Sequence, residues 1–165
     1  MIDGVVVRHH DARAASAQRE DLVTLYQGVW LSGWKDDDPF FSLTRFVARL
    51  DNHLSAPGFE LVTAHLGNEL IGYIYGFSRI GEAKFIVCEL MAAPGYRRHG
   101  VARRLHDELL GGRDERTAEL LVEKENDPAR TAYLHWGWHK AGDLRPTVDA
   151  PNYDVMAVAL PIVSR

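Results

Sequence analysis

A turn at residues 92–102 combines the residue types that bind an anion. An apolar run leads into a Pro-Gly pair, and Arg97, Arg98 and Gly100 follow before a helical pattern begins. The first turn of a helix has unpaired N–H groups and the positive end of the helix dipole, which together attract anions. Glycine lets a ligand approach the backbone, and arginine pairs with phosphate oxygens. The segment therefore predicts a pyrophosphate site.

Two common phosphate-binding loops do not fit this turn. The Walker loop needs Gly-x4-Gly-Lys-Ser/Thr, and the dinucleotide turn needs Gly-x-Gly-x-x-Gly. The turn instead contains Arg97-x-x-Gly100-x-Ala102, in which Ala102 keeps the next helical turn small. A cluster of arginines surrounds it, which is equally typical of a solvated helix face. The cluster comprises Arg97, Arg98, Arg103, Arg104 and Arg113.

The elements that must position this turn alternate between strands and helices. Short apolar or β-branched runs predict strands, and apolar residues three to four positions apart predict helices. Strands are expected at Val5–Arg8, Glu60–Leu66, Leu70–Phe77, Phe85–Ala92, Ala118–Glu123, Trp138–Leu144 and Tyr153–Leu160. Helices are expected at Asp11–Trp30, from Ser42 or Thr44 to Leu54, at Gly100–Leu110 and at Pro128–Trp136. The order β-α-α-β-β-β-α-β-α-β-β predicts a mixed α/β fold with the sheet between helices.

One carboxylate interrupts the most apolar of these strands. Phe85–Ala92 is nearly continuous in its apolar character, which predicts burial on both faces. Glu89 lies within it, and a buried carboxylate is costly unless it has a partner or a function. Both a catalytic base and a hydrogen-bonded structural carboxylate remain open at this position.

Length and composition indicate one domain that spans residues 1–165. With 165 residues, of which 46% are hydrophobic and 25% charged, the chain has average globular composition. The net charge of −4 and the isoelectric point near 6.0 argue against nucleic acid as a partner. The single cysteine excludes an intrachain disulfide, and no apolar run approaches the ~20 residues that span a bilayer. Without an export signal at its start, the chain is expected to be cytoplasmic and to have no membrane partner.

Two motifs of the chain resemble those of one enzyme family. The motif at Arg97–Ala102 resembles the Arg/Gln-x-x-Gly-x-Gly/Ala motif of the GNAT superfamily of acyl-CoA-dependent N-acyltransferases. Asn126–Trp138 reads Asn-x-x-Ala-x-x-x-Tyr-x-x-x-Gly-Trp, which is similar to the later motif of that family, although Phe is commoner than the final Trp. Arg98 and His99 are larger than many residues of the family's loop. The resemblance covers Phe85–Trp138, whereas the N-terminal third matches only in its order of elements.

The resemblance implies an acyl-CoA site between two parted parallel strands, here Phe85–Ala92 and Ala118–Glu123. Backbone groups near Met91 and Ala92 are expected to bond the pantetheine arm and the acyl carbonyl, which polarises the thioester. Asn126 is expected to contact the pantetheine arm, with Ala129 beside it. The pyrophosphate is expected to rest on the backbone N–H groups of Arg97, Arg98, His99, Gly100, Val101 and Ala102.

The family also suggests how the two protons of the reaction are handled. Tyr133 is expected to deliver a proton to the leaving thiolate, since its ordinary pKa near 10 keeps it protonated; the alternative is a packing role beside Trp136. An amine with a pKa near 10.4 must lose a proton before it attacks. Glu89 is the candidate base and Glu123 a weaker one, but many members use ordered water, so these alternatives stay open.

Other reactive residue types are expected to be structural. Cys88 is interpreted as a small core residue, and the eight histidines show no metal-ligand spacing, with His9-His10 interpreted as the cap of a strand. The acidic run Asp36–Asp38 either attracts a cationic amine or is simply solvated. Aromatic residues around this run either line an apolar pocket or anchor the loop, namely Trp30, Trp34, Phe40 and Phe41.

The implied function is transfer of an acetyl group from acetyl-CoA to a primary amine, by direct attack in a ternary complex and without a metal. The acceptor is either a small molecule or a peptide, and the resemblance allows a homodimer. A non-catalytic acyl-CoA sensor or interaction module is the alternative. An unrelated nucleotide-phosphate enzyme is disfavoured, because a Walker lysine and an acidic metal cluster are both missing from the sequence.

Overall fold

The chain is built around one sheet with the strand order β1-β2-β3-β4-β5-β7-β6. The computed structural model describes residues 2–32 and 38–162. The strands are β1 (Val5–Asp11), β2 (Glu60–Leu66), β3 (Glu69–Arg79), β4 (Lys84–Ala92), β5 (Thr117–Glu123), β6 (His139–Leu144) and β7 (Tyr153–Ala159). Neighbouring strands are antiparallel, except that β4 and β5 are parallel. This confirms the predicted mixed α/β class.

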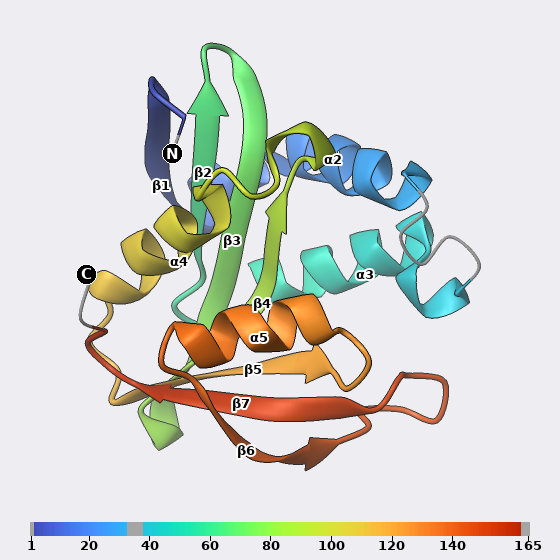
Figure 1. Cartoon of the computed structure of the whole chain (residues 1–165), viewed down its shortest axis with the longest axis vertical. Helices are drawn as coiled ribbons and strands as arrows, with labels where there is room; N and C mark the ends of the chain where they lie inside the picture. The colour runs from blue at the N-terminus through green and yellow to red at the C-terminus, as the bar shows by residue number, and fades with distance from the viewer. Residues whose placement is uncertain (1, 33–37, 163–165) are drawn as a thin grey trace.

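Helices cover both faces of the sheet (Figure 1). One face carries α1 (Ala12–Ser16), α2 (Arg19–Leu31) and α3 (Leu43–Leu54), and the other carries α4 (Val101–Gly111) and α5 (Asp127–His135). Each face has its own apolar core. Tyr26 of α2 stacks on Phe46 of α3 with ring centroids 3.8 Å apart, and Leu105 and Leu109 of α4 are fully buried on the opposite face.

The central parallel pair separates soon after it begins. Lys84–Ile86 of β4 pairs with Thr117–Glu119 of β5, and no further ladder pair joins these two strands. Figure 1 shows β5 running at a steep angle away from β4. The backbones of Val87–Ala92 and Leu120–Glu123 therefore border a gap in the sheet, as the sequence resemblance implies for two parted strands.

Strand β4 also contains a β-bulge. Tyr75 of β3 pairs with Glu89, but the next residue of β3, Gly76, pairs with Val87, so Cys88 is an extra residue. A Cβ atom at Gly76 would lie 2.2 Å from the carbonyl oxygen of Ile86, so only glycine fits opposite the bulge. Because side chains alternate along a strand, the extra residue places Glu89 on the face that carries α1–α3.

The predicted first helix is two helices. Asp11 ends β1 and caps α1, since its side chain accepts a hydrogen bond from the backbone N–H of Ala14 at 2.8 Å. The chain then turns before Arg19, where α2 begins. The break lets Ala15 and Leu22 both point into the core, where each is fully buried. The order of elements is otherwise the predicted one.

The interpretation of His9-His10 as a strand cap is wrong. β1 continues through both residues to Asp11 and pairs with β2 over its whole length. His9 bonds Glu60 at 2.8 Å and Glu108 at 3.0 Å, which raises its pKa. The backbone ladder with β2 extends β1 beyond the β-branched residues at its start.

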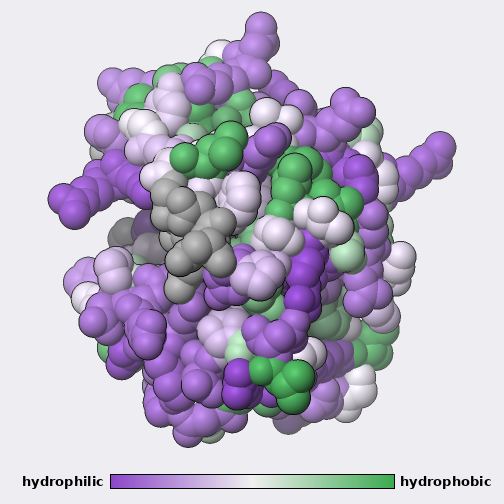
Figure 2. Space-filling model, turned by 90° about the vertical axis from the view of Figure 1, so that its right-hand side faces the viewer, coloured by the Kyte–Doolittle hydropathy of each residue, from purple (hydrophilic) through white to green (hydrophobic). Residues whose placement is uncertain are grey.

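Figure 2 shows a mostly hydrophilic surface with scattered apolar groups on one side of the molecule. Within the described ranges, no helix is long and apolar enough to span a bilayer.

Candidate active site

A cavity of about 180 Å³ lies in the gap between β4 and β5. Glu89 borders it from β4, Ala129 and Tyr133 border it from α5, and Asn126 borders it from the N-cap position of that helix. These three residues share one face of α5, because side chains three and four positions apart lie above one another on a helix. The structure thus brings four of the predicted site residues to one cavity.

A second cavity, of about 340 Å³, opens on the opposite side of the gap beside α3. Both cavities are bordered by the same six residues, Phe41, Val87, Cys88, Glu89, Leu121 and Tyr153. The two cavities therefore meet where the sheet is split, with Glu89 at their boundary. Such an arrangement allows one substrate to approach from each face of the sheet.

The N-terminus of α4 is open to an anion. Gly100 is its N-cap residue, has a φ of 79° and makes no capping hydrogen bond, whereas Ser42 and Asn126 cap α3 and α5 with their side chains. Residues 97–100 are exposed, so no side chain seals this corner. Arg98 also has a positive φ, of 65°. The first N–H groups of α4 are therefore available, as a pyrophosphate site requires.

The backbone of β4 offers a donor toward the gap. The N–H of Ala93 donates to the carbonyl of Ile71 on the β3 side, at 2.8 Å. Successive N–H groups of a strand point to opposite sides, so the N–H of Ala92 faces the gap and that of Met91 faces β3. The Met91 side chain is buried and its sulfur accepts a hydrogen bond from Tyr73. Of the two predicted backbone positions, the geometry favours Ala92.

Glu89 has the electrostatic properties of a base near neutral pH. Burial raises the pKa of its carboxyl to about 7, and the charge of Arg49 opposes this rise. No hydrogen bond or ion pair joins Glu89 to a side chain within the described ranges. Within the described residues, Glu89 is therefore not a structural carboxylate held by a fixed side-chain partner. A pKa close to the working pH suits proton transfer.

Tyr133 combines both roles that the sequence left open. Its ring packs edge-on against Trp136 and Trp138, with centroids 5.6 and 5.7 Å apart. Its side chain also borders the cavity in the gap. Burial raises the pKa of its hydroxyl, with a further contribution from the charge of Glu89, so the group stays protonated. The ring is therefore packed, and its protonated hydroxyl belongs to a side chain that borders the cavity.

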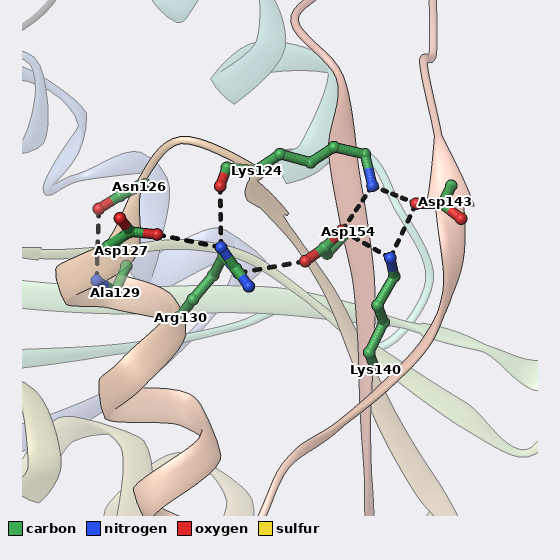
Figure 3. Close-up of polar contacts among 8 residues, drawn as sticks. All are labelled: Lys124, Asn126, Asp127, Ala129, Arg130, Lys140, Asp143 and Asp154. Carbon is green, nitrogen blue, oxygen red and sulfur yellow. Dashed lines mark hydrogen bonds and ion pairs between the residues drawn. The ribbon is translucent and has the colours of Figure 1, made fainter.

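A charged cluster fixes the start of α5 (Figure 3). Asp154 of β7 is only 4% exposed and accepts from Lys124 at 2.7 Å, from Arg130 at 3.2 Å and from Lys140 at 3.3 Å. Arg130 also donates to the carbonyl of Lys124 at 2.9 Å. The cluster ties α5 to the end of β5 and to β7. It thereby sets the position of Asn126, whose side chain accepts from the N–H of Ala129 at 3.3 Å.

Replacing Asp154 by Asn is expected to lower the free energy of unfolding by about 2 kcal/mol. Three cations would lose their shared carboxylate, although their partial exposure makes the loss smaller than for a fully buried pair. Urea unfolding at pH 7 measures this change. The matched variant Asp143→Asn removes a carboxylate that is 63% exposed and also contacts Lys124, and should cost clearly less than Asp154→Asn. Equal effects of the two variants would contradict the anchoring role.

The structure also shows where the other residues considered in the sequence lie. Cys88 is partly buried and packs against the core on the α1–α3 face, in line with the prediction, and it also borders both cavities. Glu123 also borders the first cavity. Phe40 and Phe41 line the second cavity, as one of the two alternatives predicted. Asp38 turns back to accept from the N–H of Phe40, while Trp34, Asp36 and Asp37 lie outside the described residues.

Most of the arginine cluster is used within the protein. Arg103 pairs with Asp107 at 3.2 Å, Arg104 donates to the carbonyl of Val5, and Arg113 pairs with Glu60 and Glu115. Arg97 and Arg98 are exposed beside the α4 N-terminus. These two are the members of the cluster that remain suited to an external anion.

Sequence reasoning missed three residues at the second cavity, namely Arg49, His53 and Tyr153. Arg49 and His53 lie one turn apart on α3. This spacing indicates a shared helix face but does not predict that the face meets a cavity. Which face of α3 meets the cavity depends on how the helix packs on the sheet.

Comparison with known proteins agrees with this architecture. The model of the acetyltransferase (GNAT) family matches residues 19–138. N-alpha-acetyltransferase RimI of Mycobacterium tuberculosis is 32% identical over 98 residues, which are 58% of this chain and 61% of that protein. The chain thus spans less than two thirds of that relative.

Solved structures show the same fold at low sequence identity. The ribosomal-protein-S18-alanine N-acetyltransferase of Escherichia coli has a TM-score of 0.70 at 15% identity, with 98% of this chain and 97% of that one covered. The PaiA N-acetyltransferase of Thermoplasma acidophilum, in complex with coenzyme A, has a TM-score of 0.66 at 13% identity, with 94% and 98% covered. With the parted strands and the matched family model, these findings show that the chain belongs to the GNAT family of acetyltransferases.

Proposed function

We propose that the protein transfers an acetyl group from acetyl-CoA to a primary amine by direct attack in a ternary complex. The observation that carries this proposal is the gap between β4 and β5. It is entered from both faces of the sheet, with Tyr133 on one side and Glu89 at the boundary. Each reactant would enter by its own face, and the reacting atoms would meet in the gap.

The donor half of the site fits acetyl-CoA. The open N-terminus of α4, with Arg97 and Arg98 beside it, supplies donors and positive charge for a diphosphate. The gap borders Asn126, which can contact an extended pantetheine arm. The N–H of Ala92 would hold the acyl carbonyl and stabilise the charge that develops on its oxygen.

Two side chains would manage the protons. Glu89 would take a proton from the incoming amine, for which its pKa of about 7 is suited. Tyr133 would donate to the departing sulfur. Burial raises the pKa of this hydroxyl, but the same dry surroundings also raise the pKa of a thiol. The donation therefore stays close to balance as the thiolate forms.

Thiol release from acetyl-CoA in the presence of a panel of amines tests the proposal. Release that depends on the amine supports catalysis. Binding of acetyl-CoA without release would indicate a sensor, and tighter binding of ATP than of acetyl-CoA would indicate a nucleotide enzyme. The relative from Mycobacterium tuberculosis is named as an N-alpha-acetyltransferase, so peptide N-termini belong in the panel.

The variant Tyr133→Phe is expected to lower kcat about 10- to 100-fold and to change KM less than about threefold. The ring would still pack on Trp136 and Trp138, and only the proton donor would be lost, an interaction made mainly in the transition state. Steady-state kinetics measures both constants. Tyr153→Phe removes another hydroxyl at the same cavity and serves as the matched control, with a smaller loss. A Tyr133→Phe variant with wild-type kcat would reduce Tyr133 to a packing residue.

A further inference from the structure

The cavity beside α3 has the size and lining of a small-molecule site. Its volume of about 340 Å³ lies within the range of such sites. Its wall is largely apolar and aromatic, formed by Phe40, Phe77, Ile86, Leu121, Pro146 and Tyr153. A ligand that fills it must therefore present an apolar body.

The wall of this cavity carries both a carboxylate and two guanidinium groups. Glu89 marks the boundary with the gap, and Arg49 and Arg79 supply positive charge elsewhere on the wall. Tyr75 faces Glu89 in the ladder, and Phe77 and Arg79 follow on the same face of β3. At the rise of a strand, Arg79 lies about 13 Å along β3 from the level of Glu89, with the Phe77 ring between them. Arg79 thus lies at the end of the wall that is far from Glu89, whereas Arg49 is near enough for its charge to lower the pKa of Glu89.

Arg49 is positioned to receive an anion. It donates to the carbonyl of Phe40 at 2.8 Å, and its guanidinium lies 4.9 Å from the centroid of the Phe40 ring. No carboxylate within residues 2–32 and 38–162 forms an ion pair with it. A guanidinium has five N–H donors, so most of those on Arg49 are not used by this contact. Arg79 is half exposed and only 3.9 Å from Glu82, which makes it a weaker second cation.

His53 adds an unsatisfied polar atom to the same wall. Its Nδ1 atom is buried and has no hydrogen-bond partner in the described part of the chain. Its ring stacks on Phe77 with centroids 5.9 Å apart. Burial lowers the pKa of His53, and the charge of Arg49 adds to this effect, so both favour the neutral ring. A buried polar atom without a partner is costly, and a polar group of a ligand would satisfy it.

We propose that this cavity binds an acceptor that carries an apolar, preferably aromatic, body between its amine and an anionic group. The amine would lie at Glu89, and the anion would pair with Arg49. The inference rests on the proposed function, because it assigns the acceptor of the same reaction. A polyamine is expected to be a poor acceptor, since its second ammonium group would lie near Arg49 and Arg79.

Calorimetry on the CoA-saturated protein tests the inference without requiring turnover. The probes are 4-(aminomethyl)benzoate, benzylamine, which lacks only the carboxylate, and spermidine. We expect 4-(aminomethyl)benzoate to bind at least tenfold more tightly than benzylamine, as for a hydrogen bond to a charged group. Spermidine should bind more weakly than either. Equal binding of the first two probes, binding of neither, or preference for spermidine would overturn the inference.

Variants of α3 identify the residue responsible. Arg49→Gln should remove the preference for the carboxylate, and Arg49→Lys should retain part of it. Arg45→Gln is the matched control, because Arg45 lies one turn earlier, pairs with Asp149 and does not line this cavity. Equal losses in the Gln variants of Arg45 and Arg49 would refute a specific role of Arg49. Unchanged affinity for acetyl-CoA shows that each variant is folded.

A peptide comparison and a thiol-release assay identify the kind of acceptor and distinguish failure of the inference from failure of the proposed function. The C-terminal amides of Glu-Ala-Ala and Gln-Ala-Ala differ only in the side-chain carboxylate, so tighter binding of the Glu peptide would place the anion on a peptide N-terminus, whereas equal binding would leave it on a small acid. Thiol release with benzylamine as fast as with 4-(aminomethyl)benzoate would overturn the inference and leave the proposed function intact. Failure of acetyl-CoA to bind at all would instead contradict the proposed function.

Discussion

Replacing Glu89 by Gln is expected to lower kcat/KM for the amine by about 100-fold or more, the size of a typical general-base contribution. Glutamine has nearly the same shape but cannot accept a proton from the amine. In the wild-type protein, kcat/KM should rise with pH through about 7, because the carboxyl must ionise before it acts as a base. The variant should lose this acid limb.

The same substitution is expected to stabilise the fold at alkaline pH. The folded pKa of about 7 exceeds the ordinary value of 4.5, so the folded state binds more protons than the unfolded state between these values. The contribution of Glu89 to stability is therefore greatest below about pH 4.5 and is lost as the pH rises through about 7. Because Gln carries no charge to bury, Glu89→Gln should gain about 2–3 kcal/mol over the wild type at pH 8.

Urea unfolding of both proteins at pH 5 and pH 8 measures this gain. The groups that feel the charge of Glu89 include Tyr26 of α2, Tyr75 of β3, Tyr133 of α5 and Tyr153 of β7, which stay protonated in this range, as well as Arg49 of α3. A wild-type rate without an acid limb, together with full activity of Glu89→Gln, would assign proton removal to water. A variant less stable than the wild type at pH 8 would show that the carboxylate has a structural role.

Replacing Gly100 by Glu is expected to weaken acetyl-CoA binding by about 100-fold or more. The carboxylate would stand at the N-terminus of α4, where the diphosphate would bind, and two like charges about 4 Å apart repel strongly. It would also compete for the helix N–H groups that otherwise meet the phosphates. Isothermal titration with acetyl-CoA measures the loss.

Gly100→Ala separates charge from backbone strain. Any side chain at a φ of 79° is strained, by roughly 1–2 kcal/mol, so both variants should lose stability to a similar extent. The Ala variant should nevertheless keep acetyl-CoA affinity within about tenfold of the wild type. If the Glu and Ala variants bound acetyl-CoA equally well, the diphosphate would not lie at this helix terminus.

The part of the site that the sequence predicted is local in the chain. An apolar strand, a Pro-Gly turn and a glycine before a helix stand next to one another, so their geometry follows from neighbouring residues. The Asn126–Trp138 motif is local in the same sense. Its Asn126 cap and the shared helix face of Ala129 and Tyr133 follow from helix geometry alone.

The parts that escaped prediction depend on distant partners. β1 extends to Asp11 because β2 offers it a ladder, and His9 finds Glu60 and Glu108 far along the chain. The role of Arg49 depends on which face α3 turns toward the split sheet. The bulge at Cys88 could not be read from β4, because it requires Gly76 on the neighbouring strand.

Gly76 decides which face of the sheet carries the Glu89 side chain. In a regular strand with the same residues, Glu89 would project toward α4 and α5 and would share a face with Tyr133. The Glu89 side chain lies on the opposite face because the Ile86 carbonyl occupies the place where a Cβ atom of residue 76 would stand. A genetic screen for inactive variants is therefore expected to identify residue 76 together with the residues proposed to act on the substrates. The role of residue 76 would be to permit the bulge in β4, which determines the face on which Glu89 lies.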